Sequence, residues 1–388
     1  MHFYAGQRRR KQQLMAFVLS SICLFLFWMM FLSEREPSDV YLLQQSLSFT
    51  CYFYQKKIVS GNLCQNLCQR RNLYIDQCLS CETQYKVFTG QLYTAGSEDR
   101  SNILIKHFQV DDRPLYLDSD MFHSEEDLRG AISSHLQLKF GQFHFEGLIR
   151  AILILADSDN NEHISRAEAR TMISLMMNND FIMTVVLAGN DKVPNLIGYC
   201  GDIFVTEGVD SYRLQADAES WDLFTSLPPW PTRVRIAVSI LEFVEDIQDL
   251  FLGNLLLCSL SDASIGLVSE EASFYNLEWL ASETQIREHL KYHPCLSSED
   301  CTYGPNCATQ CGPMGMCISN TTRINLPQTC SILETFITRG APRTFYPKLK
   351  GLVDRCISMD PARKDIFMEH SLVLNDLKNS LWYEIHLL

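Results

Sequence analysis

The chain has 388 residues, of which 46% are hydrophobic, and a formal net charge of −13 at pH 7. This acidic balance argues against nucleic-acid binding, because a surface that neutralises phosphates needs clustered positive charge. The length is sufficient for a large hydrophobic core divided between two lobes.

The first 32 residues predict a membrane anchor. A basic cluster, Arg8 to Lys11, precedes an uncharged apolar run over residues 14–32, and Glu34 and Glu36 follow it. About 20 apolar residues cross a bilayer core, and positive flanks stay in the cytosol. Since no small-residue cleavage site ends the run, we expect a cytosolic tail (1–13) and a type II anchor rather than a signal sequence.

Cysteine usage supports a luminal location. One of the 15 cysteines, Cys23, lies in the apolar run, and the other 14 follow it. An even number on the oxidising side of a membrane favours disulfides, whose pairing the sequence does not reveal. Zinc is the alternative for Cys64-x3-Cys68 and Cys78-x2-Cys81. Asn320 opens a glycosylation sequon, Asn-Thr-Thr.

The predicted elements begin with a stem and a cysteine-rich knot over residues 33–84, followed by short strands over 85–109. Helices are then expected at 124–138, 145–156, 165–178, 232–250 and 371–385, and strands within 193–205 and at 255–257. A β-rich part with a helical insert precedes a helical part. That order fits a two-lobed protein kinase among other α+β folds.

Residues 157–168 have the spacing of an EF-hand calcium loop. Side chains with oxygen atoms occupy loop positions 1, 3, 5, 9 and 12, which are Asp157, Asp159, Asn161, Ser165 and Glu168. At position 7 the expected ligand is the backbone carbonyl of His163. Position 6 normally holds Gly, and Glu162 replaces it at a cost on the order of 1 kcal/mol. We expect one weak Ca²⁺ site; the alternative is a loop that keeps the shape and has lost the ion.

Several later strings are specific in combination: Leu196 to Asp202, Leu241 to Asp246, Glu299 to Cys301, Arg339 to Pro342 and Met368 to Leu372. With the anchor, the knot and the calcium loop, they resemble the divergent protein kinase domain family, class one, whose members are cysteine-rich type II membrane proteins of the endoplasmic reticulum. The resemblance implies an α+β, two-lobed kinase-like fold. Its N-lobe would be residues 85–206, with the EF-hand insert at 145–178, and its C-lobe residues 207–388.

Kinase chemistry needs a lysine on strand β3 that binds the nucleotide phosphates and pairs with an acid on helix αC. Lys106, after Ile103 to Ile105, resembles that lysine and would contact ATP/Mg²⁺; the alternative is a solvated lysine at a strand end. Two acids, Glu168 and Asp180, precede the next strand, and the sequence does not distinguish them as its partner.

The remaining kinase positions differ from the family pattern. Ser259 stands where the catalytic Asp is expected, Ser264 where a metal-binding Asn is expected, and Asn276 where the second metal-binding residue, an Asp, is expected. Neutral oxygens bind Mg²⁺ weakly and do not accept the proton of a substrate hydroxyl. The sequence therefore favours a pseudokinase with an unknown luminal protein partner. The alternatives are an active, atypical secretory-pathway kinase and a purely structural disulfide-rich membrane protein.

Overall fold

The computed structural model describes residues 39–70, 72–81, 85–93, 100–108, 124–211, 228–248, 250–261, 264–318, 325–360 and 366–387. The chain divides into two compact units, 1–45 and 46–388; the fold below is that of the second, and its first helix begins within the first. Within the described ranges, no helix is both long and apolar enough to cross a bilayer. The predicted anchor (14–32) and Asn320 lie outside those ranges.

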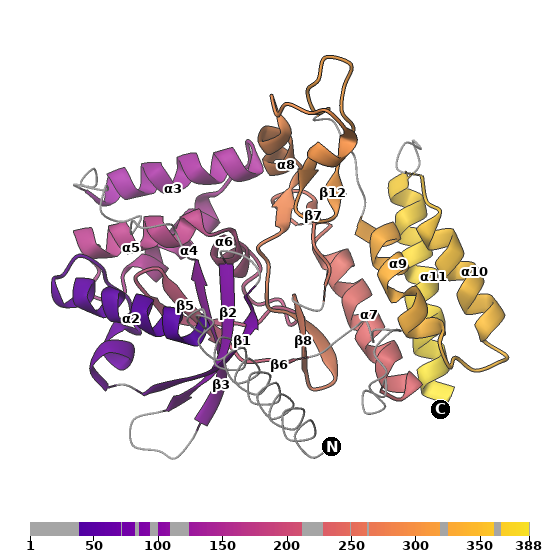
Figure 1. The fold of residues 1–388 in the computed structure, drawn as a ribbon, viewed down its shortest axis with the longest axis horizontal. Coiled ribbons are helices and arrows are strands. Elements are labelled where there is room, and N and C mark those ends of the chain that lie inside the picture. Colours follow the sequence, from indigo (N-terminus) through magenta and orange to yellow (C-terminus); the bar gives the residue numbers. More distant parts are fainter. Residues whose placement is uncertain are drawn as a thin grey trace, which may run out of the picture. The chain divides into compact units, whose positions relative to one another are not determined.

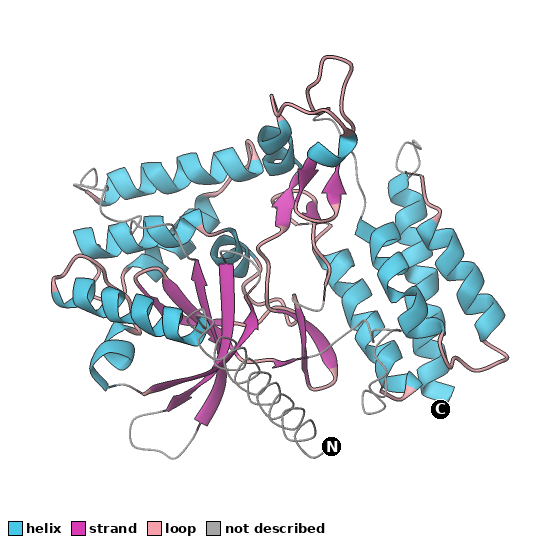
Figure 2. Ribbon diagram, in the orientation of Figure 1, coloured by secondary structure: helices cyan, strands magenta, loops and turns pink. Residues whose placement is uncertain are grey.

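A five-stranded antiparallel sheet organises the N-terminal half (Figure 2). Its order is β1-β2-β3-β5-β4, from β1 (Leu73–Ser80), β2 (Tyr85–Tyr93), β3 (Arg100–Phe108), β5 (Ile203–Glu207) and β4 (Leu196–Cys200). The apolar run Ile103 to Ile105 is buried on both faces of β3, as expected of a central strand. The edge strand β1 comes from the segment predicted as part of the knot.

Four helices lie between β3 and β4 in sequence and stack beside the sheet in Figure 1: α3 (Glu125–Phe140), α4 (Glu146–Ala156), α5 (Arg166–Met177) and α6 (Asn179–Val186). Capping boxes start α3 at Ser124 and α5 at Ser165. Buried residues on α3 recur every four positions, at Leu128, Ile132, Leu136 and Phe140, so one face of α3 packs on the core.

The C-terminal half contains small sheets and a helical group. Strands β6 (Asp210–Ser211), β8 (Ile265–Val268) and β9 (Glu271–Phe274) form one sheet, and β7 (Leu255–Leu257) pairs with β10 (Leu280–Ser282). The helices are α7 (Trp230–Asp246), α8 (Glu283–Leu290), α9 (Asn325–Thr338), α10 (Tyr346–Ile357) and α11 (Ile366–Leu387). Helix α2 (Asp39–Gln55) precedes the sheet, in the segment predicted as stem and knot; short elements complete the chain: η1 (Asn66–Arg70), η3 (Ser298–Asp300), β11 (Thr302–Tyr303) and β12 (Cys307–Ala308).

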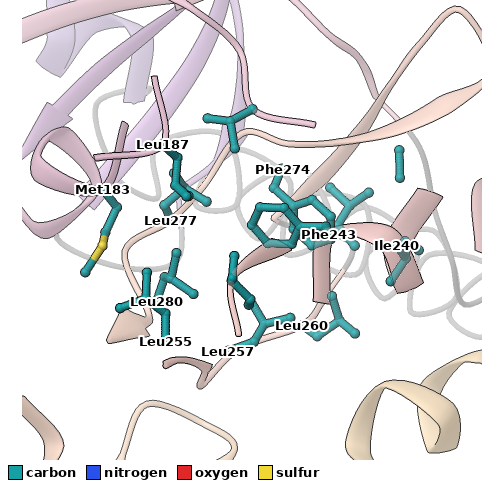
Figure 3. Close-up of a cluster of buried hydrophobic side chains, with 14 of the residues drawn as sticks. Met183, Leu187, Ile240, Phe243, Leu255, Leu257, Leu260, Phe274, Leu277 and Leu280 are labelled. Carbon is teal, nitrogen blue, oxygen red and sulfur yellow. The ribbon is translucent and has the colours of Figure 1, made fainter. Parts of the chain in front are cut away.

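One apolar cluster joins the two halves (Figure 3). Met183 and Leu187, at α6, lie in the same cluster as Leu277 and Leu280. The rings of Phe243 on α7 and Phe274 on β9 stack with centroids 3.8 Å apart. Helix α6 therefore packs against the C-terminal half through the same core that supports the sheet.

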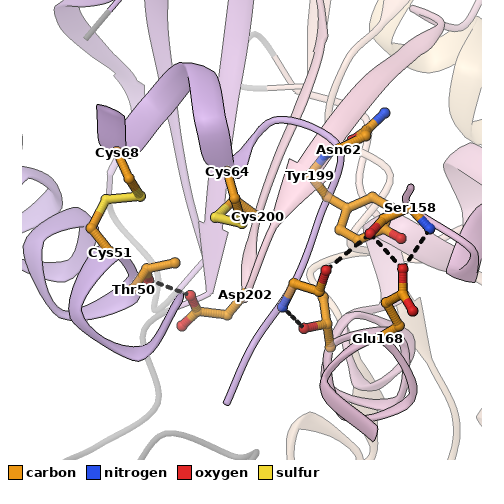
Figure 4. The surroundings of a disulfide bond; sticks show 12 residues. Thr50, Cys51, Asn62, Cys64, Cys68, Ser158, Glu168, Tyr199, Cys200 and Asp202 are labelled. Atoms are coloured by element: carbon orange, nitrogen blue, oxygen red, sulfur yellow. Dashed lines mark hydrogen bonds between the residues drawn. A yellow bond between two sulfur atoms is a disulfide. The ribbon is translucent and has the colours of Figure 1, made fainter. Parts of the chain in front are cut away.

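Disulfides join all 14 cysteines of the described residues, so zinc binding by the early cysteines was the wrong alternative. The pairs are Cys51–Cys68, Cys64–Cys200, Cys78–Cys81, Cys258–Cys307, Cys295–Cys311, Cys301–Cys317 and Cys330–Cys356. Cys64–Cys200 spans 136 positions and fastens the knot to β4 (Figure 4). A cross-link that closes so long a loop removes much conformational entropy from the unfolded chain.

Candidate functional site

Lys106 forms a buried ion pair with Asp180. Its Nζ lies 2.9 Å from Oδ2 of Asp180, and the two side chains are 1% and 0% exposed. The pair joins β3 to the start of α6. Glu168, the other candidate acid, instead accepts hydrogen bonds from Ser158 and Ser165. The structure thus selects Asp180 as the partner, and Lys106 is not a solvated lysine at a strand end.

Two further groups bind the Asp180 carboxylate. The hydroxyl of Tyr85, on β2, donates to Oδ2, and the backbone N–H of Leu277 donates to Oδ1 at 2.7 Å. Burial lowers the pKa of Lys106, an effect that the Asp180 charge opposes, whereas burial and the same charge raise the pKa of Tyr85. Lys106, Tyr85, Asp180 and the amide of Leu277 form one hydrogen-bonded group, which we call the Lys106 cluster.

The two segments that meet beside this cluster carry the residues predicted at kinase catalytic and metal-binding positions, which are Ser259, Ser264 and Asn276. Ser264 is buried; its hydroxyl donates to the carbonyl of Ser261 at 2.8 Å, and its own carbonyl accepts from the N–H of Tyr275 at 3.0 Å. Oδ1 of Asn276 accepts from the N–H of Glu278 at 3.1 Å. Ser259 is half-buried after β7. Asn276 directly precedes Leu277, so the position expected to bind metal adjoins the Lys106 cluster and is neutral.

The sheet face that carries Lys106 is covered by packed side chains. Leu104 lies two residues before Lys106 on β3, so the two side chains share a face of the sheet. On β2, Val87 is directly opposite Lys106, and Tyr85 lies two residues before Val87, so both are on that face as well. Tyr85, Val87 and Leu104 are all 0% exposed and belong to the cluster that contains Phe274. In this conformation, the lysine has no exposed surface through which a phosphate could approach.

The predicted calcium loop connects α4 to α5 as a helix–loop–helix. Ligand atoms of Asp157, Asp159 and Glu168 lie within 4.8 Å of one another. Oδ1 of Asp157 accepts from the N–H of Asn161 at 3.0 Å, and Oδ1 of Asn161 accepts from the N–H of His163 at 2.8 Å. The three carboxylates of the loop therefore lie close together, and Ca²⁺ binding stays a prediction.

Glu162, at loop position 6, has a φ of 63°. This is the left-handed backbone conformation for which glycine is preferred. The loop therefore makes the sharp turn with a strained backbone at Glu162. The Ser158 hydroxyl, which lies near the Cys64–Cys200 disulfide in Figure 4, is 2.9 Å from the hydroxyl of Ser60. The loop is thus packed against the knot.

Comparison with protein families identifies both halves. A family model described as the N-terminal cysteine-rich ER part of FAM69 matches residues 6–152, and one described as the protein-kinase domain of FAM69 matches residues 172–359. The chain belongs to the FAM69 family. The two model descriptions name a protein-kinase domain and a cysteine-rich part of the endoplasmic reticulum. They agree with the family resemblance seen in the sequence. The predicted calcium loop falls between the two matched ranges.

In this FAM69 chain, the sequence pointed to Lys106, Ser259, Ser264 and Asn276 but not to Tyr85. The kinase roles of Ser259, Ser264 and Asn276 stay predictions. Tyr85 starts β2 and contacts Asp180 across a separation of 95 residues. No local pattern marks such a contact; only the placement of α6 over the sheet brings the two side chains together.

Proposed function

We propose that this chain is a luminal pseudokinase that acts as an interaction or regulatory module without phosphotransfer. The observation that carries the proposal is the chemistry at Ser259, Ser264 and Asn276. In a kinase, an Asp at the first of these sites orients the attacking hydroxyl, and an Asn and an Asp at the other two bind the Mg²⁺ ions. Here Ser264 and Asn276 are neutral and hydrogen-bonded to backbone groups.

A phosphotransfer assay separates this proposal from the active-kinase alternative. The purified chain is incubated with radiolabelled ATP and Mg²⁺ or Mn²⁺, with protein and glycan hydroxyl acceptors. The expected result is incorporation no higher than that of the Lys106→Met variant. Incorporation by the native chain that disappears in Lys106→Met would show an active atypical kinase.

We also propose that the loop between α4 and α5 binds one Ca²⁺ ion weakly, which would make the module responsive to luminal calcium. Support comes from the convergent carboxylates of Asp157, Asp159 and Glu168. Sites in calcium-rich compartments typically have dissociation constants of about 10⁻⁴–10⁻³ M. Calorimetry should give such a value for the native chain and a flat titration for Glu168→Gln. The matched control is Glu162→Gln, which removes the same charge from a side chain that the loop does not use as a ligand.

The family assignment to the endoplasmic reticulum agrees with the predicted location, and the topology is a proposal. Residues 14–32 would anchor the chain, with the C-terminal domain in the lumen. Protease added outside sealed microsomes should remove only the N-terminal tail, and Asn320 should carry a glycan. Digestion of the C-terminal domain together with an unmodified Asn320 would contradict this orientation.

A further inference from the structure

Asn179, the neighbour of Asp180, binds the segment that follows Asn276. Its Nδ2 donates to the carbonyls of Glu278 at 2.7 Å and Leu280 at 2.8 Å, with a longer contact of 3.3 Å to Leu277. Asp180 accepts from the N–H of Leu277. Two consecutive side chains at the start of α6 therefore hold one short stretch of the opposite half of the domain.

The other side of the Asn179 amide is equally occupied. Its Oδ1 accepts from Nζ of Lys139, on α3, at 2.8 Å and from Nε2 of Gln285, on α8, at 3.1 Å. Gln285 also donates to the hydroxyl of Tyr303 at 2.6 Å. Burial lowers the pKa of Lys139 to about 8. Since both N–H donors and both oxygen lone pairs are used, only an amide side chain fits this position.

A second attachment lies after the far end of α6. The backbone carbonyl of Lys192 accepts from the N–H of Phe274 at 2.7 Å. The side-chain Nζ of Lys192 lies 2.8 Å from the carboxylate of Glu271 and 3.5 Å from that of Glu242. Lys192 is itself buried, at 5% exposure. Helix α6 is thus fastened on both sides to the C-terminal half, at β9 and α7 through Lys192 and at residues 277–280 through Asn179.

Nucleotide entry in two-lobed kinases depends on movement of one lobe against the other. We propose that Asn179 and Lys192 form a lock that holds the two halves closed over Lys106 and prevents nucleotide from reaching it. The inference rests on the proposed pseudokinase function and adds to it a reason why the site is inaccessible. The 1% exposure of Lys106 is the state the lock maintains.

The test combines hydrogen exchange with a lysine-reactive ATP acyl phosphate, whose acyl group forms an amide with a nearby lysine and releases the nucleotide. In the native full-length chain, residues 271–285 should be protected equally with and without Mg²⁺–ATP, and Lys106 should remain unlabelled. Asn179→Asp keeps the shape but directs a carboxylate at three carbonyls. It should raise exchange across residues 277–285 by about tenfold or more and expose Lys106 to the probe.

Asn195→Asp is the matched control: it makes the same change at the exposed residue before β4, where Nδ2 donates to Glu207, and it should leave both readouts native. If Asn179→Asp fails to fold, Gln285→Ala, which removes one bond to Asn179, should give the same changes at smaller amplitude. Labelling of Lys106 in the native chain, or native exchange in a folded Asn179→Asp or Gln285→Ala variant, would overturn the lock. Labelling without phosphotransfer would overturn the lock and leave the pseudokinase proposal intact, whereas phosphotransfer would contradict that proposal directly.

Discussion

At the scale of single residues, the Lys106 cluster is a buried ion pair whose two members have different numbers of partners. Asp180 accepts from three donors, whereas Lys106 has the Asp180 carboxylate and the face of Phe204, whose ring centre lies 5.3 Å from Nζ. A buried charge that loses its partner is costly, and a buried pair by itself adds little. The two members of the pair should therefore respond unequally to mutation.

Asp180→Asn should destabilise the chain by about 3–5 kcal/mol, because Lys106 stays buried without a counter-ion and an amide has only one accepting oxygen for three donors. Lys106→Met should cost less, since Asp180 keeps Tyr85 and Leu277. Combining both changes should cost less than Asp180→Asn alone. Non-reducing denaturant unfolding of the three variants measures this order, and equal losses for the two single variants would contradict it.

His135 on α3 should give the protein a defined acid sensitivity. Burial, together with the nearby Lys139 charge, lowers its pKa to about 4. The unfolded chain therefore binds a proton first as pH falls below about 6.5, and stability should decrease by on the order of 2 kcal/mol between that pH and about 4. His135→Gln should flatten this part of the stability–pH curve, and His386→Gln, at an exposed position on α11, should not. An unchanged slope in His135→Gln would refute the assignment.

At the scale of elements, local patterns predicted local structure well. The helices on either side of the predicted calcium loop lie within one residue of their expected bounds, because the apolar periodicity of α4 and the capping box of α5 are encoded in neighbouring residues. The partner of Lys106 could not be chosen, because α5 and α6 both carry an acid and only their packing on the sheet decides between them. The roles of Tyr85 and Asn179 were invisible for the same reason: their partners are 95 and about 100 residues away.

The backbone conformation at Glu162 should affect the Ca²⁺ affinity of the predicted calcium loop. Glu162→Gly removes a side chain held at a φ of 63° and should relieve about 1 kcal/mol of strain. Only the strain that is relieved in the Ca²⁺-bound loop and not in the free loop raises the affinity. Ca²⁺ affinity should therefore rise by at most about fivefold. Calorimetry of Glu162→Gly beside Glu162→Gln distinguishes backbone relief from loss of charge. Equal affinities in the two variants would show that the turn does not limit binding.

At the scale of the whole molecule, each of the seven disulfides joins residues within one half. The shared apolar cluster and the attachments of α6 cross between the halves and hold the sheet and the helical half in a single arrangement. A kinase uses two arrangements, one that admits nucleotide and one that reacts. In the pseudokinase that we propose, the arrangement that admits nucleotide has no use, and the neutral side chains of Ser259 and Asn276 agree with the proposed lock between the halves.

This view predicts that restoring the missing residues alone will not restore nucleotide binding. A triple variant with Ser259→Asp, Ser264→Asn and Asn276→Asp should show no rise in melting temperature with Mg²⁺–ATP, because Lys106 remains covered. Adding Asn179→Asp should produce a rise, since a ligand present at ten times its dissociation constant stabilises by about 1.4 kcal/mol. Mg²⁺ without nucleotide is the control for ion binding by the new carboxylates. A shift in the triple variant equal to that of the quadruple variant would mean that the charges, and not the lock, exclude the nucleotide.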